Sequence, residues 1–76
     1  MNWQNYISMD PKVMLGKPVI KGTRLTVELI VERLGQGQTT EELLISYPHI
    51  NREAIMACLQ YAARVLSNEV IYEIAA

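Results

Sequence analysis

The stretch Gly16-Lys17-Pro18-Val19-Ile20-Lys21-Gly22-Thr23-Arg24 places two glycines, a proline and three cations around a short β-branched pair. Glycine adopts positive φ angles readily, whereas proline fixes φ and lacks a backbone donor. The stretch therefore predicts a turn, a short strand and a second turn. Its basic side chains would then project from a fairly rigid ribbon.

The length of 76 residues predicts a single domain spanning residues 1–76. A domain of this size buries a small core, so help from a second subunit is expected. The one cysteine, Cys58, cannot form an internal disulfide, and no secretory leader or apolar run of about 20 residues is evident. These features predict a cytoplasmic protein that does not cross a membrane.

The formal net charge is −1, but the charges are distributed unevenly. Residues 1–33 carry five basic and three acidic side chains, whereas residues 34–76 carry two basic and five acidic ones. No acid interrupts the four cations between Lys12 and Arg24. This asymmetry is compatible with phosphate contact by the N-terminal part. It is equally compatible with a lysine-rich edge strand that resists edge-to-edge pairing.

The pattern of apolar residues predicts a short N-terminal β arm followed by three helices, and therefore a mainly α fold. The predicted boundaries are about 5–25 for the arm and about 27–35, 40–47 and 52–74 for the helices.

Local sequence signals support each predicted helix start. Thr26, Thr39 and Asn51 are suitable N-caps, and Glu42 stands three residues after Thr39, at capping-box spacing. Gly35 and Gly37 predict the end of the first helix, and Pro48 ends the second.

The third helix carries more apolar surface than one core contact requires. One stripe is predicted to face the first two helices, and its members are Ile55, Leu59, Ala62 and Leu66. A second stripe predicts a homodimer interface made by Met56, Ala63, Val70 and Ile74. Alternatively, the chain breaks at Ser67-Asn68 and its last third folds back over this stripe.

The short second helix, tight connection and longer third helix are typical of a helix-turn-helix unit, in which the later helix enters the major groove of DNA. Asn51 and Arg52 would then contact base edges, since these side chains pair with adenine and guanine. The predicted phosphate contacts are Lys17, Lys21, Thr23 and Arg24. Alternatively, the layout is a plain trihelical bundle in which Thr23 bonds local backbone and Arg24 pairs with Glu28.

No catalytic, cofactor or metal site is predicted. The glycines and Lys17 do not have the spacing of a phosphate-binding loop. With one histidine, His49, and one cysteine, no metal-ligand cluster can be assembled from these residue types. His49 lies in a predicted turn, where a solvated or capping role is expected. The chain is therefore not predicted to be an enzyme.

The run from Gly16 to Val27, together with Gly35-Gln36-Gly37 and the Tyr47-Pro48 pair before Asn51, resembles a small prokaryotic domain family of unknown function. Members of that family are assigned to the VapB class of antitoxins. The resemblance covers about residues 7–66. It implies a homeodomain-like or winged-helix-like trihelical fold. It also implies a regulator that represses its own operon and binds a PIN-like nuclease toxin.

A long toxin-wrapping tail, usual in antitoxins, is not evident in this sequence. The alternative function is accordingly a protein-interaction module that never touches DNA. Such a module would dock a basic partner through Trp3 and the acidic C-terminal half.

Overall fold

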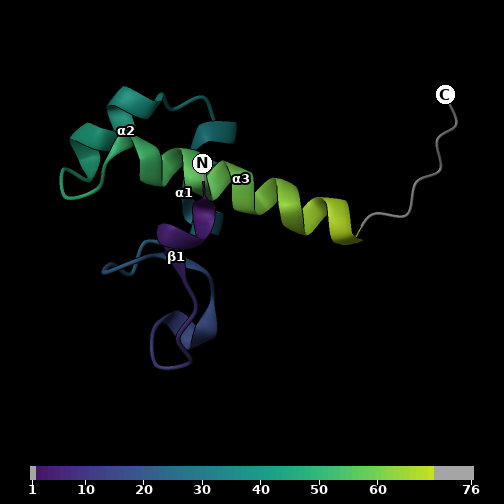
Figure 1. The fold of residues 1–76 in the computed structure, drawn as a ribbon. Coiled ribbons are helices and arrows are strands. Elements are labelled where there is room, and N and C mark those ends of the chain that lie inside the picture. Colours follow the sequence, from purple (N-terminus) through teal and green to yellow (C-terminus); the bar gives the residue numbers. More distant parts are fainter. Residues whose placement is uncertain (1, 70–76) are drawn as a thin grey trace, which may run out of the picture.

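The computed structural model describes residues 2–69, in which three α-helices follow a short β arm (Figure 1). The fold is mainly helical with one two-stranded sheet, as the sequence predicted. The arm contains the 3-10 helix η1 (Trp3–Asn5), strand β1 (Ile7–Ser8), the 3-10 helix η2 (Met14–Gly16) and strand β2 (Val19–Ile20). The helices are α1 (Val27–Gly35), α2 (Thr40–Ser46) and α3 (Arg52–Glu69).

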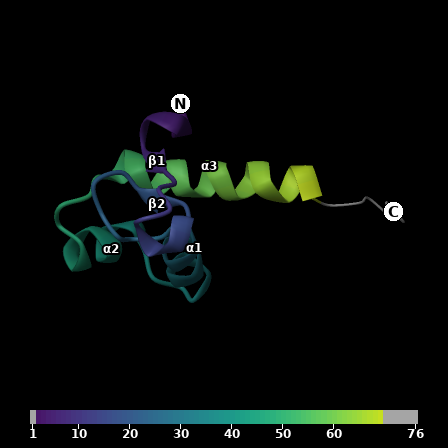
Figure 2. The ribbon, with the colours of Figure 1, turned by 90° about the horizontal axis from the view of Figure 1, so that it is seen from below.

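The two strands pair antiparallel, with Ile7 opposite Ile20 and Ser8 opposite Val19. Lys21 continues the pairing, because its N–H donates to the Tyr6 carbonyl at 2.8 Å. The buried side chains of Ile7 and Ile20 face the core, so the arm is packed against the helices. Figure 2 shows the strands lying beside α3.

The Gly22-Thr23-Arg24 corner turns the chain from β2 toward α1. Gly22 has a φ of 79°, and the Thr23 hydroxyl donates to the Ile20 carbonyl at 2.8 Å. The same hydroxyl accepts from the Leu25 N–H at 3.0 Å. Thr23 therefore stabilises the turn by bonding local backbone, as the alternative interpretation of a plain trihelical bundle predicted.

The loop between the strands contains backbone strain that the sequence did not predict. Met14 and Leu15 have φ angles of 48° and 59°, in the left-handed region that side chains with a Cβ avoid. Leu15 is 94% exposed, so its side chain has almost no burial to offset this cost.

Replacing Leu15 by glycine should therefore stabilise the protein by about 0.5 to 1 kcal/mol, since relief of strain exceeds the entropic cost of glycine. For a domain of this size, that gain corresponds to a rise in Tm of roughly 2–8 °C, measurable by thermal circular dichroism. Leu15→Ala is the matched control and should leave Tm unchanged, because alanine keeps the strain. Equal Tm values for Leu15→Gly and Leu15→Ala would contradict this explanation.

All three predicted N-caps are confirmed. The Thr26 hydroxyl accepts from the Leu29 N–H at 3.0 Å. Thr39 and Glu42 form the complete capping box, with distances of 3.1 and 2.8 Å. The Asn51 side-chain oxygen accepts from the Ala54 N–H at 2.8 Å. These contacts satisfy donors that a helix start otherwise leaves unpaired.

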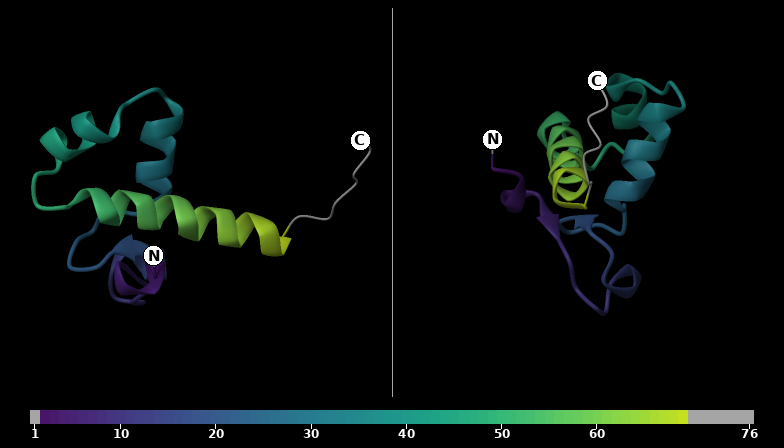
Figure 3. Two further views of the ribbon diagram at one scale, coloured as in Figure 1. Left: turned by 45° about the horizontal axis from the view of Figure 1, so that its top comes forward. Right: turned by 90° about the vertical axis from the view of Figure 1, so that its right-hand side faces the viewer.

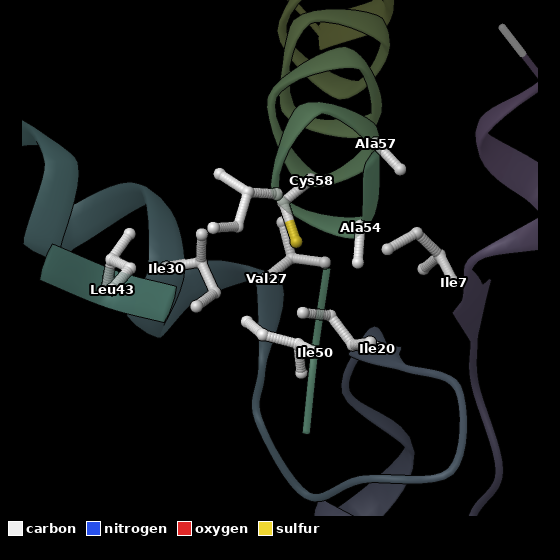
Figure 4. Close-up of a cluster of buried hydrophobic side chains, with 10 residues drawn as sticks. Ile7, Ile20, Val27, Ile30, Leu43, Ile50, Ala54, Ala57 and Cys58 are labelled. Atoms are coloured by element: carbon white, nitrogen blue, oxygen red, sulfur yellow. The ribbon is translucent and has the colours of Figure 1, made fainter. Parts of the chain in front are cut away.

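The core lies where the arm and all three helices meet (Figure 4). Its largest fully buried side chains come from the arm and from all three helices and are Val19, Ile30, Leu43, Ile55 and Cys58. Trp3 packs at the edge of this core, where its ring meets Tyr61 edge-on at a centroid distance of 4.9 Å.

The predicted core stripe of α3 is wrong in two members. Ile55 is buried, but Leu59 and Leu66 are 46% and 60% exposed. The arm packs against α3 from one side and α1 from the other, so the buried face is centred on Ala54 and Cys58. Each residue turns the helix by about 100°, which carries Leu59 away from that face.

α3 continues through Ser67 and Asn68 to Glu69, the last described residue, so the alternative in which the helix breaks at Ser67-Asn68 is wrong. The predicted extension of the helix to residue 74 lies outside the described residues. No helix within residues 2–69 is both long and apolar enough to span a membrane.

Candidate nucleic-acid interface

A polar hollow of about 150 Å³ lies where the end of β2 meets the start of α3. Three of the six predicted DNA-binding residues line it, namely Lys21, Thr23 and Asn51. His49, from the connection between α2 and α3, lines it as well. The β pairing and the caps described above hold these segments together, so residues distant in sequence share one surface.

The hollow offers hydrogen-bond donors and positive charge. Lys21 is exposed, and its backbone is fixed by the bond to Tyr6. The Asn51 oxygen is occupied by its cap bond, but its amide nitrogen has no partner among the described residues. The amino-terminal end of α3 adds the positive end of an 18-residue helix. Together these groups favour an anion such as a phosphate.

The other three predicted residues do not line the hollow. Lys17 pairs with Glu28 at 3.1 Å, so the predicted pairing of Arg24 with Glu28 is wrong. Arg24 is exposed and forms no ion pair within residues 2–69. Arg52 pairs with Glu41 of α2 at 3.1 Å.

The pair between Arg52 and Glu41 affects both side chains. Hydrogen bonding to its own backbone N–H, and then to Arg52, lowers the pKa of the Glu41 carboxyl below its usual value. Glu41 is therefore charged at neutral pH and offsets the positive charge of Arg52 beside the start of α3. A base or phosphate contact by Arg52 would have to compete with this carboxylate.

Sequence reasoning did not include His49 in the site. It lies 28 positions from Lys21, and only the packing of the arm against α3 brings them to one hollow. The sequence did contain one signal for His49: it stands two residues before the Asn51 cap. Residues just before a helix start lie near the positive end of that helix.

An apolar groove of about 460 Å³ lies on another part of the surface, between α1 and the C-terminal half of α3. Val31, Tyr61 and Val65 line its floor, and the Lys17 and Glu28 pair lies at its rim. Within residues 2–69, no group of three histidine, cysteine or acidic side chains is placed to hold a metal ion.

The fold is thus a small mainly helical domain whose two-stranded arm is packed beside the start of its longest helix. The chain belongs to the family described as "Protein of unknown function (DUF433)", which matches residues 7–62. The expected membership of an uncharacterised family is therefore confirmed. A comparison with curated proteins found no match.

A solved structure supports the same fold. It is the crystal structure of a DUF433 member protein from Anabaena variabilis ATCC 29413, which is 32% identical and similar with a TM-score of 0.79. The similarity covers 86% of this chain and 64% of that one, so this chain spans less than two thirds of that protein.

Proposed function

We propose that this protein is a DNA-binding regulator of the VapB antitoxin class, with a helix-turn-helix formed by α2 and α3. The observation that carries the proposal is the polar hollow, in which Lys21, His49 and the positive end of α3 share one surface. A phosphate in this hollow would anchor α3 by its amino-terminal end, which is how recognition helices approach the major groove.

The contacts divide by chemistry. Lys21 and Arg24 are exposed cations of the GKPVIKGTR stretch and would contact successive phosphates. The free amide nitrogen of Asn51 can donate to a base edge, whereas Thr23 serves the turn. Arg52 would join the interface on release from Glu41.

The number of phosphate contacts sets the expected dependence on salt. Contacts by Lys21, Arg24 and the positive end of α3 give a slope of log affinity against log salt of roughly −2.7. Glu41 and Glu53 are exposed near the start of α3, where their carboxylates repel DNA phosphates. This repulsion keeps the sequence-independent part of the DNA affinity weak.

Binding of a PIN-like nuclease is the second half of the proposal. Its support is the apolar groove between α1 and α3, whose rim carries Glu32 beside the paired Lys17 and Glu28. Such a groove is suited to an apolar segment with a basic residue near Glu32. The same groove also favours the second candidate function, a protein-interaction module without DNA binding. In that case the Arg52 and Glu41 pair would stay closed.

We expect Lys21→Ala to weaken binding to the protein's own upstream DNA by about five- to tenfold and to reduce the salt slope by about one. Fluorescence anisotropy across a salt series, with a scrambled duplex for comparison, measures both quantities. Lys12→Ala is the matched control, since it removes the same charge from a residue outside the hollow and should have a smaller effect.

Absence of binding to either duplex at low salt would exclude the autonomous regulator and leave the interaction module. Equal losses for Lys21→Ala and Lys12→Ala would show that the cations act without the hollow. Preference for the native duplex, together with a larger loss of affinity for Lys21→Ala than for Lys12→Ala, would support the proposal.

A further inference from the structure

The loop between β1 and β2 (residues 9–18) presents apolar side chains to solvent from a strained but well-ordered backbone. Met14 and Leu15, the two residues with left-handed φ angles, are both exposed. Three backbone hydrogen bonds of 2.8–3.1 Å hold the loop in this shape, each to a carbonyl three residues earlier, and their donors are Val13, Gly16 and Lys17. Strain of this kind is typical of residues that grip a ligand or a partner.

The apolar groove between α1 and the C-terminal half of α3 begins where this loop ends. Lys17 and Pro18 line the groove, whereas Leu15, at most roughly 10 Å of chain before Pro18, does not. The groove volume of about 460 Å³ is within the range of pockets that hold a small organic ligand, so it has room for the apolar side chains of a loop tip. In the right-hand view of Figure 3, the loop extends past the helices on one side of the fold. A projection and a groove therefore lie next to each other on one surface.

We propose that the tip of this loop enters the groove of a second copy of this chain, and that the second copy returns the contact about a two-fold axis. A two-fold interface uses the same surface on both copies, so that surface must be complementary to itself. A projection beside a groove meets this condition, because each copy can insert its Leu15 and receive the partner's Leu15. The contact removes from water apolar side chains that one copy alone leaves exposed.

The charges around the loop and the groove also fit a second copy. Glu32 lies at the rim of the groove and Lys12 lies just before the loop tip, and both side chains are exposed. Neither forms an ion pair in the part of the chain that the structure describes, whereas Glu28 at the rim is already paired with Lys17. The carboxylate of Asp10 accepts from the Lys12 backbone N–H at 2.9 Å, so it is held within the loop. Lys12 of each copy would therefore face the partner's Glu32.

The dimer interface predicted from the sequence is a different surface. Met56 and Ala63 are exposed on α3, but neither lines the groove. Val70 and Ile74 lie outside the described residues. The loop and the groove therefore define a separate surface for association. This pairing goes beyond the proposed function and does not depend on DNA binding, but a nuclease in the groove would exclude the loop of the second copy.

The contact made by each loop tip is small, so we expect a weak dimer with a dissociation constant on the order of 10–100 μM. Circular dichroism at about 5 μM therefore measures the monomer. The changes in Tm expected above for Leu15→Gly and Leu15→Ala are those of the monomer, in which this side chain is in water.

Sedimentation velocity of the full chain from about 5 to 500 μM tests the pairing. We expect the wild-type chain to pass from monomer to dimer over this range. Leu15→Glu should stay monomeric with an unchanged circular dichroism spectrum, because the exposed side chain is not needed for folding and a carboxylate would enter an apolar groove beside Glu32. Ile45→Glu is the matched control, since it adds the same charge at an exposed residue of α2 outside the groove, and it should dimerise like the wild type.

A wild-type chain that stays monomeric at about 500 μM would overturn the proposal and leave the groove to a different partner. A dimer that survives Leu15→Glu would also overturn it, as would one that Ile45→Glu dissociates equally well. Association that continues past the dimer as the concentration rises would exclude the two-fold exchange, because contacts that do not close form open chains.

A charge exchange tests the ion pair across the dimer. Lys12→Glu alone and Glu32→Lys alone should each raise the dissociation constant by about fivefold, because each places like charges together at two symmetric contacts. The chain carrying both substitutions should return to within about twofold of the wild-type constant, since the pair is restored in reverse. Losses that add up in the double variant would exclude this arrangement of loop and groove.

Discussion

Ile55→Ala should remove about 2–5 kcal/mol from the free energy of unfolding. Ile55 is 1% exposed and lies in the cluster that joins the arm to all three helices, so its truncation leaves a cavity that a chain of 76 residues has little means to fill. A domain of this length has a total stability of roughly 4–11 kcal/mol. Urea unfolding followed by circular dichroism would therefore show a much lower midpoint with a similar slope.

Leu59→Ala is the matched control for this substitution. Leu59 is also an aliphatic residue of α3, four positions later, but it is 46% exposed and outside the core. We expect Leu59→Ala to cost less than about 1 kcal/mol. Equal costs for the two would mean that Leu59 belongs to the core, as the predicted core stripe required.

The signals that sequence analysis interpreted correctly are local ones. Thr26, Thr39 and Asn51 cap their helices because the hydroxyl or amide oxygen needs only the backbone N–H three residues ahead. The short strand at Val19–Ile20 follows similarly from β-branched residues between two turns. Neither feature depends on the rest of the fold.

The errors concern choices that packing makes. The sequence of α3 allows two apolar stripes, and only the position of the arm and α1 decides that Cys58 faces inward while Leu59 faces outward. Glu28 pairs with Lys17 and not with Arg24, although Arg24 is nearer to it in the sequence. The reason is that the chain before β2 places Lys17 beside α1. The strained Leu15 has no sequence signal, since glycine and asparagine are the usual markers of positive φ.

The candidate site was predictable in part. Lys21, Thr23 and Asn51 were identified from residue type and position, and the structure places all three around one hollow. The separate role of each of these residues was not predictable, because it depends on hydrogen bonds that form only in the folded chain. Thr23 and the Asn51 oxygen are used for turn and cap, which leaves Lys21, His49 and the Asn51 amide nitrogen for a ligand.

The thiol of Cys58 should react with iodoacetamide about a thousandfold more slowly in the native protein than in the unfolded chain. The side chain of Cys58, on α3, is fully buried in the core, and this burial raises the pKa of its thiol from 9.0 to about 12. Because the thiolate is the reactive form, a rise of three pKa units lowers its concentration about a thousandfold near pH 8.

The raised pKa also fixes the direction of the pH dependence. The unfolded chain loses the thiol proton above about pH 9, whereas the native chain retains it to about pH 12, so this contribution to stability is complete below pH 9 and declines above it. Cys58→Ala should flatten that decline in urea unfolding between about pH 9 and 12.

Ile45→Cys in a Cys58→Ala background provides the exposed thiol for comparison, and mass spectrometry measures both rates of alkylation. We expect the thiol at position 45 to react nearly as fast in the native protein as in denaturant, because its side chain is in water. A native Cys58 that reacts as fast as that thiol would mean that α3 opens readily from the core. The helix whose start borders the hollow would then lack the rigidity that the proposed function requires.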